Sequence, residues 1–174
     1  MRHLVWCVCL VAACATLPHG VPRLESFDAR RLEGEWYVHA TNFPNWLDGT
    51  RTDPRFHYRV RGREILDQVS YVEAGRRETI DGIDTQDPEM PSHFTWRGVG
   101  WLRMFTSDWV IVAAGPDDRW LVLYFTSTLA TPEGVDVIAR APEMSAEDRA
   151  AITRLIWEDP FLASRSSHLT WIRE

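Results

Sequence analysis

Short runs in which apolar and polar residues alternate follow one another along most of this chain. Period-two alternation over four to eight residues is typical of half-buried β-strands. Turn residues separate the runs, among them Asn42-Phe43-Pro44-Asn45 and Gly115-Pro116-Asp117-Asp118. The pattern predicts an antiparallel all-β sandwich or barrel. Its eight runs are residues 35–42, 55–60, 64–72, 77–83, 93–98, 109–114, 120–126 and 135–141.

A helical pattern follows the last of these runs. Ser145, with Asp148 three residues later, resembles a capping box, and Ile152, Leu155 and Ile156 form an apolar stripe at helical spacing. We expect a helix over 146–157 whose stripe packs against the outside of the sheet. Residues 169–172 are expected to add a last edge strand.

Eight antiparallel strands in up-and-down order can close into a barrel. Closure removes the exposed edges and leaves an interior wide enough for side chains plus one small ligand. In that order the end of the first run and the connections near residue 75, at 98–108 and at 126–134 share the open rim. Gly62, the 84–92 segment and the 115–118 turn lie at the floor. Closure also brings Arg140 next to Trp36 there.

The N-terminal segment has the pattern of a secretory signal. Arg2 precedes an apolar run, residues 4–13, which is too short to span a bilayer. Val11-Ala12-Ala13-Cys14 resembles a bacterial lipobox, in which Cys14 becomes the lipidated first residue, whereas Ala13-Cys14-Ala15 fits an ordinary signal-peptidase site. We favour the lipobox, because a cysteine at that position is rare unless its thiol is used.

These signals divide the chain into a signal peptide at 1–13, a tether at 14–23 and one barrel domain at 24–174. Both cleavage sites remove Cys7 and Cys9, so we expect no disulfide, thiolate metal site or cysteine nucleophile in the domain. The length of 174 residues fits one domain with a hydrophobic core. The net charge of −6 argues against a nucleic-acid partner, and every residue in the Lys+Arg count of 19 is arginine.

Three motifs carry a family resemblance. Residues 27–37 contain a Gly-x-Trp motif at Gly34 and Trp36, Thr79-Ile80-Asp81-Gly82 lies in the fourth run, and Arg140 stands shortly before the predicted helix. The chain resembles the lipocalins over about residues 24–172, and most closely the bacterial lipoprotein branch related to apolipoprotein D. The family's middle Thr-Asp-Tyr motif is replaced here by the 115–118 turn.

The resemblance implies an eight-stranded antiparallel up-and-down β-barrel with the C-terminal helix packed outside. It implies that Trp36 plugs the floor of the barrel, that the Arg140 guanidinium stacks on its ring, and that Gly34 leaves room for the chain to cross. It also implies a function without a cofactor, namely the binding and storage or transport of a small hydrophobic ligand.

Strand alternation predicts which side chains face the lumen. With Trp36 inside, the first run also turns Val38 and Ala40 inward, while His39, His57 and His93 face outward without metal-ligand spacing. Runs six and seven are apolar on both faces, so for these two runs the inward residues are those that the family resemblance implies. The expected lining is Val38, Ala40, Phe56, Tyr58, Val60, Phe94, Trp96, Val110, Val112, Leu121, Leu123 and Phe125. The alternative is a fully packed core without a vacancy.

Large apolar side chains also gather in two rim connections. Such a patch marks a binding mouth or a membrane contact, unless the two loops simply pack on each other. The residues are Phe43, Trp46, Leu47, Trp101, Leu102, Met104 and Phe105.

Few polar residues offer chemistry inside the barrel. Tyr58, Tyr124 and Arg103 are candidates to meet a carboxylate or phosphate head group, and Asp67 and Asp136 would matter if their strands turn them inward. The leading hypothesis is a binding protein for a fatty acid, lysophospholipid or similar molecule. The alternative is a barrel enzyme, an isomerase, hydratase or cyclase, that uses an inward aspartate beside Tyr58. A third is a partner-binding protein that uses the rim tryptophans.

The expected localisation depends on which of the two N-terminal cleavage sites is used. A lipidated Cys14 would attach the protein to a membrane of the bacterial cell envelope, and the neutral Ala15 favours the outer membrane. Ordinary cleavage would leave a periplasmic or secreted protein.

Overall fold

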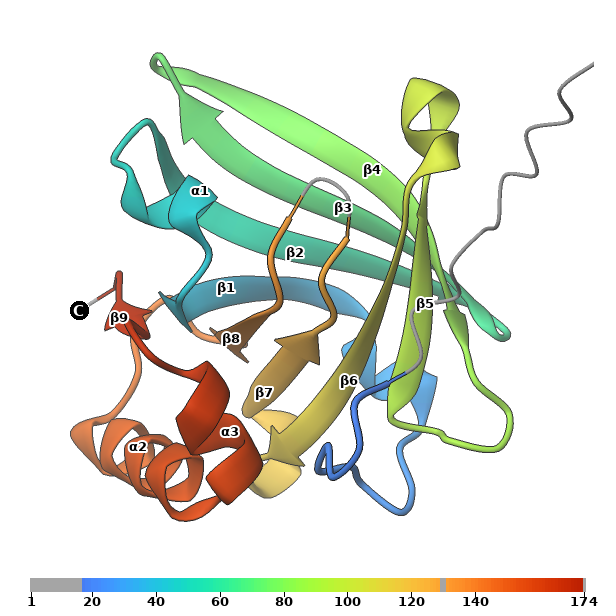
Figure 1. The fold of residues 1–174 in the computed structure, drawn as a ribbon. Helices are drawn as coiled ribbons and strands as arrows, with labels where there is room; N and C mark the ends of the chain where they lie inside the picture. The colour runs from blue at the N-terminus through green and yellow to red at the C-terminus, as the bar shows by residue number, and fades with distance from the viewer. Residues whose placement is uncertain (1–16, 129–130, 174) are drawn as a thin grey trace, which may run out of the picture.

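The chain folds into one antiparallel sheet that closes on itself. The computed structural model describes residues 17–128 and 131–173, so the predicted signal peptide and Cys14 lie outside the described residues. Strands β2 to β8 are neighbours in chain order, and β1 pairs with both β8 and β2, which closes the barrel (Figure 1). The strands are β1 (Gly34–Thr41), β2 (Arg51–Arg61), β3 (Glu64–Glu73), β4 (Arg76–Gln86), β5 (His93–Gly98), β6 (Thr106–Ala114), β7 (Trp120–Phe125), β8 (Gly134–Ala139) and β9 (Thr170–Trp171).

Helical segments connect or cover these strands. The Ser145 hydroxyl accepts a hydrogen bond from the Asp148 amide at 3.0 Å and so caps the longest helix, α2, at its N-terminus. None of the helices within 17–128 and 131–173 combines the length and apolar character needed to span a membrane. They are η1 (Ala29–Leu32), α1 (Pro44–Leu47), η2 (Gly100–Met104), η3 (Pro116–Asp118), α2 (Ala146–Glu158) and α3 (Pro160–Arg165).

Helix α2 packs against the outer surface of the barrel, with α3 beside it (Figure 1). Ile152 and Ile156, from the predicted stripe, are fully buried in this contact. Strand β9 pairs with the end of β1. The predicted eight-stranded barrel with a C-terminal helix outside is therefore confirmed.

Two features of the elements differ from the prediction. Helix α3 was not foreseen, although Asp159 caps it by accepting a hydrogen bond from the Leu162 amide at 3.0 Å and Pro160 occupies its first turn. Strand β2 begins at Arg51, four residues earlier than predicted. Its register is interrupted between Thr52 and Arg55, where Asp53 has φ 52°.

Buried side chains form two separate clusters, one on each side of the barrel wall. The outer cluster lies between the wall and the C-terminal helices and includes Val122, Val135, Val137, Ile152 and Ile156. The inner cluster lies in the lumen. Its buried members in the strands are Trp36, Val38, Phe56, Tyr58, Ile65, Phe94, Trp109, Ile111, Leu121, Leu123 and Ile138, and Val60, Trp96 and Phe125 pack against them.

The inward orientation predicted for Val110 and Val112 is wrong. Both lie in the outer cluster, and Trp109 and Ile111 face the lumen instead. Strand β6 is apolar on both faces, so alternation could not decide between the two. A hydrogen bond accounts for the inward orientation of Trp109, because its Nε1 donates to Asp84 Oδ1 inside the barrel at 2.8 Å.

The inward orientation predicted for Ala40 is also wrong, because the register of β1 shifts between Val38 and Ala40. Beyond this irregularity Ala40 pairs with Val137 of the outer cluster, and Thr41 pairs with Asp136. Strict alternation fails wherever one strand gains a residue relative to its neighbour. The bulge therefore exchanges the two faces over the last residues of the strand.

Two residues expected in water or near a ligand are buried outside the barrel. His39 points outward but is fully buried, and its Nε2 lies 2.9 Å from the Ala141 carbonyl; burial lowers the pKa of His39. Tyr124 packs edge-on against Phe161, and its hydroxyl donates to Glu133 at 2.7 Å. Tyr124 is therefore not available to a ligand in the lumen.

Candidate functional site

The barrel floor is closed by a tryptophan and an arginine that are distant in sequence. The Arg140 guanidinium carbon lies 3.8 Å from the centre of the Trp36 ring. Its Nη1 and Nη2 donate to the carbonyls of Glu33 and Arg31 at 2.7 and 2.6 Å. Gly34 adopts φ +104°, and a Cβ atom there would lie 3.3 Å from Arg140 Nη1. The floor is thus a rigid base rather than an entrance.

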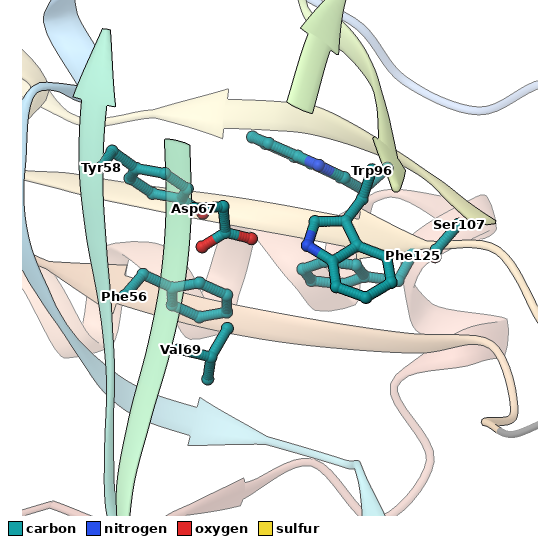
Figure 2. Close-up of a pocket in the computed structure, with 8 residues that line it drawn as sticks. Phe56, Tyr58, Asp67, Val69, Trp96, Ser107 and Phe125 are labelled. Atoms are coloured by element: carbon teal, nitrogen blue, oxygen red, sulfur yellow. The ribbon is translucent and has the colours of Figure 1, made fainter. Parts of the chain in front are cut away.

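Above this floor the lumen retains a cavity of about 120 Å³. Figure 2 shows the side chains around it, with Tyr58, Phe56 and Val69 on one side and Trp96 and Phe125 on the other. The lining is mostly aromatic, as in many small-molecule sites. Its eight residues are Phe56, Tyr58, Asp67, Val69, Trp96, Ser107, Trp109 and Phe125.

The rings around the cavity form a continuous layer. The centres of Tyr58 and Trp109 are 6.3 Å apart, those of Trp109 and Phe125 are 6.0 Å apart, and those of Phe56 and Tyr58 are 5.7 Å apart, all in near-parallel arrangement. Phe94 supports this layer from below by stacking on Trp109 at 4.3 Å. Aromatic pairs at such distances add to the stability gained from burial alone, so the wall of the cavity is preorganised.

Trp96 reaches its place because the facing residue has no side chain. A Cβ atom at Gly82 would lie only 1.9 Å from Trp96 Nε1, so only glycine lets the indole lie against β4. Gly82 belongs to the Thr-Ile-Asp-Gly segment singled out in the sequence. That motif therefore has a structural role in shaping the cavity.

Asp67 is the acidic residue in the cavity wall. It pairs across the sheet with Tyr58 on β2 and with Gly82 on β4, and its side chain faces the lumen with 5% of the residue exposed. No group among the described residues donates a hydrogen bond to Asp67 Oδ1. Burial raises the pKa of Asp67 well above its ordinary value, and the nearby Asp84 raises it further.

Two further aspartates are buried in the barrel. Asp84 accepts the hydrogen bond from Trp109, and Asp136 faces Thr41. Burial raises the pKa of Asp84, and it raises that of Asp136 to about 7. The sequence did not determine on which face of the sheet Asp67 and Asp136 lie. In the structure both side chains face the lumen. Asp84 was missed, because it was assigned to a floor connection whereas β4 continues to Gln86.

The rim residues divide into a packed group and an exposed group. Phe43 contacts Phe125 edge-on at 5.5 Å between ring centres, and Trp46 contacts Tyr71 at 5.5 Å. Trp101 and Met104 in η2 are 79% and 76% exposed. Phe43 and Trp46 therefore pack against aromatic side chains of the barrel strands, whereas η2 presents apolar side chains to the surroundings.

Comparisons with known proteins rest on structure alone, since no family model and no curated protein sequence matches the chain. Lobster apocrustacyanin A1 is similar with a TM-score of 0.64 and 14% identity, over 91% of this chain and 93% of its own. Insecticyanin from the tobacco hornworm Manduca sexta is similar with a TM-score of 0.69 and 12% identity, over 88% of this chain and 84% of its own.

The fold is a lipocalin fold. At these identities the similarity establishes the arrangement of the strands and says nothing about a shared ligand. The bacterial lipoprotein branch suggested by the motifs stays a prediction.

Within this lipocalin fold the cavity includes only part of the predicted lining. Four predicted residues contribute to it, and three others that sequence reasoning did not assign to the lining, Val69, Ser107 and Trp109, complete it beside Asp67. The predicted residues at the cavity are Phe56, Tyr58, Trp96 and Phe125, with Phe94 directly behind Trp109. Val38, Val60, Leu121 and Leu123 lie in or against the inner cluster elsewhere in the lumen.

Proposed function

We propose that the protein binds a small hydrophobic molecule in the lumen of its barrel and stores or transports it. The observation that carries this proposal is the aromatic cavity of about 120 Å³ inside the barrel. A cavity of about 150 Å³ lined by apolar side chains holds one benzene molecule. The present cavity therefore suits a ligand with a compact apolar part. The lipocalin fold supports the same role, because it surrounds such a cavity with a closed wall.

The narrower proposal of a fatty acid or lysophospholipid requires more space. Pockets for drug-sized ligands occupy about 300 to 1,000 Å³, so a long acyl chain would have to displace rim side chains. Phe125 lines the cavity and contacts Phe43 at 5.5 Å between ring centres. A long-chain ligand is thus part of this proposal only together with a movement of such rim side chains.

For the location we propose the bacterial cell envelope, with attachment to a membrane through a lipid on Cys14. The support is the lipobox-like sequence at 11–14, and Ala15 favours the outer membrane. Mass spectrometry of the protein purified from its own envelope would show a mature chain beginning at a modified Cys14. A mature chain that begins at Thr16, or at an unmodified Cys14, would refute the lipid attachment.

One observation favours the barrel enzyme as a second candidate function. Asp67 lies in the cavity wall opposite Tyr58, where a carboxyl group could exchange a proton with a bound molecule. The two functions differ in what happens to the ligand. Unchanged ligand recovered after prolonged incubation supports a binding protein, whereas a new isomer or a hydrated product supports the enzyme.

The binding function is tested by calorimetric titration with 1-alkanols of increasing length. Each buried methylene contributes about 0.8 kcal/mol, so the affinity should rise from butanol onward and level off once the cavity is filled. Val69→Phe places a larger side chain in the cavity and should abolish binding of the longer members. The matched control is Val99→Phe at the rim, where the valine is already 48% exposed and substitution should leave the affinity unchanged. An absence of binding for the whole series would refute the proposal.

A further inference from the structure

The cavity wall carries a buried acidic group that the barrel itself does not neutralise. Asp67 is 5% exposed, lines the cavity, and receives no hydrogen bond on Oδ1 from the described residues. Figure 2 shows its carboxylate directed between the rings of Tyr58 and Phe56 and those of Trp96 and Phe125. Unpaired buried carboxylates are strongly unfavourable, and native proteins normally pair them.

The surroundings of Asp67 add negative rather than positive charge. Asp84 lies near enough to raise the pKa of Asp67, and both Asp84 and Asp136 act on Tyr58 in the same interior. None of the eight lining residues, all within the described part of the chain, is basic. A bound cation would therefore stabilise the carboxylate form of Asp67, whereas an anionic head group would be disfavoured beside these acidic groups.

The rings provide the second half of a cation site. The faces of tryptophan, tyrosine and phenylalanine attract cations within about 6 Å of the ring centre, most strongly where water is excluded. Phe56, Tyr58, Trp96, Trp109 and Phe125 all line the cavity that Asp67 enters. A positive group at Asp67 would thus gain a counter-charge and several ring faces together.

The side chains around the cavity are better suited to an organic cation than to a metal ion. Within residues 17–128 and 131–173, no three His, Cys, Asp or Glu side chains are arranged to hold a metal. Aromatic carbon provides no ligand for a hard metal ion, whereas it packs well around an ammonium group that carries apolar substituents. The volume of about 120 Å³ limits the buried part of the ligand to about the size of one aromatic ring.

We propose that the lumen selects a small organic ammonium ion, whose charged nitrogen pairs with Asp67 and whose apolar part lies among Phe56, Trp96 and Phe125. This inference rests on the proposed binding function and specifies the class of ligand. It differs from the fatty-acid hypothesis in the sign of the charge that the lumen accepts.

The test compares three ligands of similar size and different charge at one pH. The probes are 2-phenylethylamine (cationic), 2-phenylethanol (neutral) and 3-phenylpropanoate (anionic), titrated into the full-length protein. We expect the amine to bind at least about tenfold more tightly than the alcohol, and the carboxylate to bind most weakly. Asp67→Asn keeps the shape of the wall and removes the ionisable carboxyl group, so it should abolish the preference for the amine while binding of the alcohol is retained. Asp117→Asn makes the same change at an exposed position in η3 and should leave the preference intact.

The outcomes separate this inference from the function on which it rests. If the alcohol binds and the amine binds no better, or if Asp67→Asn leaves the preference for the amine unchanged, the ammonium proposal is refuted and the binding function stands. If no member of the set binds, and the alkanol series also fails, the binding function itself is refuted. Circular dichroism of Asp67→Asn establishes that the variant is folded, and Asp67→Ser provides a second uncharged variant if it is not.

Discussion

Single residues in this barrel act through contacts that span the whole sequence, and Arg140 is the clearest case. Its guanidinium stacks on Trp36 and donates to two carbonyls of the segment before β1. A stacked cation and two charge-assisted hydrogen bonds together contribute about 2 to 4 kcal/mol. The residue therefore ties the end of β8 to the start of β1.

We predict that Arg140→Ala lowers the free energy of unfolding by about 2 to 3 kcal/mol in urea denaturation and barely changes ligand affinity. The reason is that the floor lies apart from the cavity, whose lining does not include Arg140 or Trp36. Arg59→Ala, at an exposed arginine of β2, should change stability by less than about 0.5 kcal/mol. A large loss of affinity at unchanged stability would contradict the assignment of Arg140 to the floor.

Asp136 gives a prediction about pH. Burial raises its pKa to about 7, whereas an unfolded aspartate titrates near about 3.9. Between these values the folded protein binds the extra proton, so this residue makes the fold less stable as the pH rises from about 4 to about 7. Asp136→Asn removes that dependence. The variant should gain about 1 to 2 kcal/mol in unfolding free energy relative to wild type between pH 5 and pH 8, measured by urea denaturation.

Parallel stability curves for Asp136→Asn and wild type across this range would contradict the burial of an uncompensated carboxyl group at Asp136. The comparison with the variant is needed because His39 has the opposite effect. Its lowered pKa makes the fold less stable as the pH falls.

At the scale of elements, the C-terminal helices are bound to the barrel by few, fully buried side chains. Ile156 of α2 is 1% exposed in the outer cluster, and the adjacent Trp157 is 65% exposed. The face of the helix on which each side chain lies therefore determines how much these two neighbouring residues contribute to the stability of the fold.

We predict that Ile156→Ala lowers the free energy of unfolding by about 2 to 4 kcal/mol, because it leaves a cavity between α2 and the wall. Trp157→Ala should change it by less than about 0.5 kcal/mol. Thermal or urea denaturation of the two variants provides the measurement. Equal effects of the two substitutions would show that α2 does not pack through this face.

The sequence predicts most elements and fails where local geometry overrides alternation. Turn residues and period-two patterns locate the eight strands, and the Ser145 cap locates α2. The face of β6 could not be predicted, because Trp109 and Val110 are both apolar and only the hydrogen bond to Asp84 distinguishes them. The register shift after Val38, which turns Ala40 outward, depends on pairing with β8 and has no local sequence signal.

The residues of the candidate site also divide into those that the sequence predicts and those that it does not. Phe56, Tyr58, Trp96 and Phe125 are predictable from alternation and from family resemblance. The inward orientation of Asp67 was not predictable, since an aspartate in a strand usually faces water. Its position follows from the register between β2, β3 and β4, which places Asp67 beside Tyr58 and Gly82.

At the scale of the whole molecule, the barrel combines a floor closed by Trp36 and Arg140 with a cavity that is lined by aromatic rings and a buried carboxyl group. In the proposed function a ligand would lie among these rings, above the floor. The exposed Trp101 and Met104 lie beyond the rim and are not part of the chamber.

The most direct test of the central claim is a measurement of intermolecular nuclear Overhauser effects between bound 2-phenylethanol and the protein. Ligand protons should show contacts with the indole protons of Trp96 and Trp109, which line the cavity. Contacts confined to the exposed Trp101 or Trp157 would place the ligand on the surface and contradict a binding site inside the barrel.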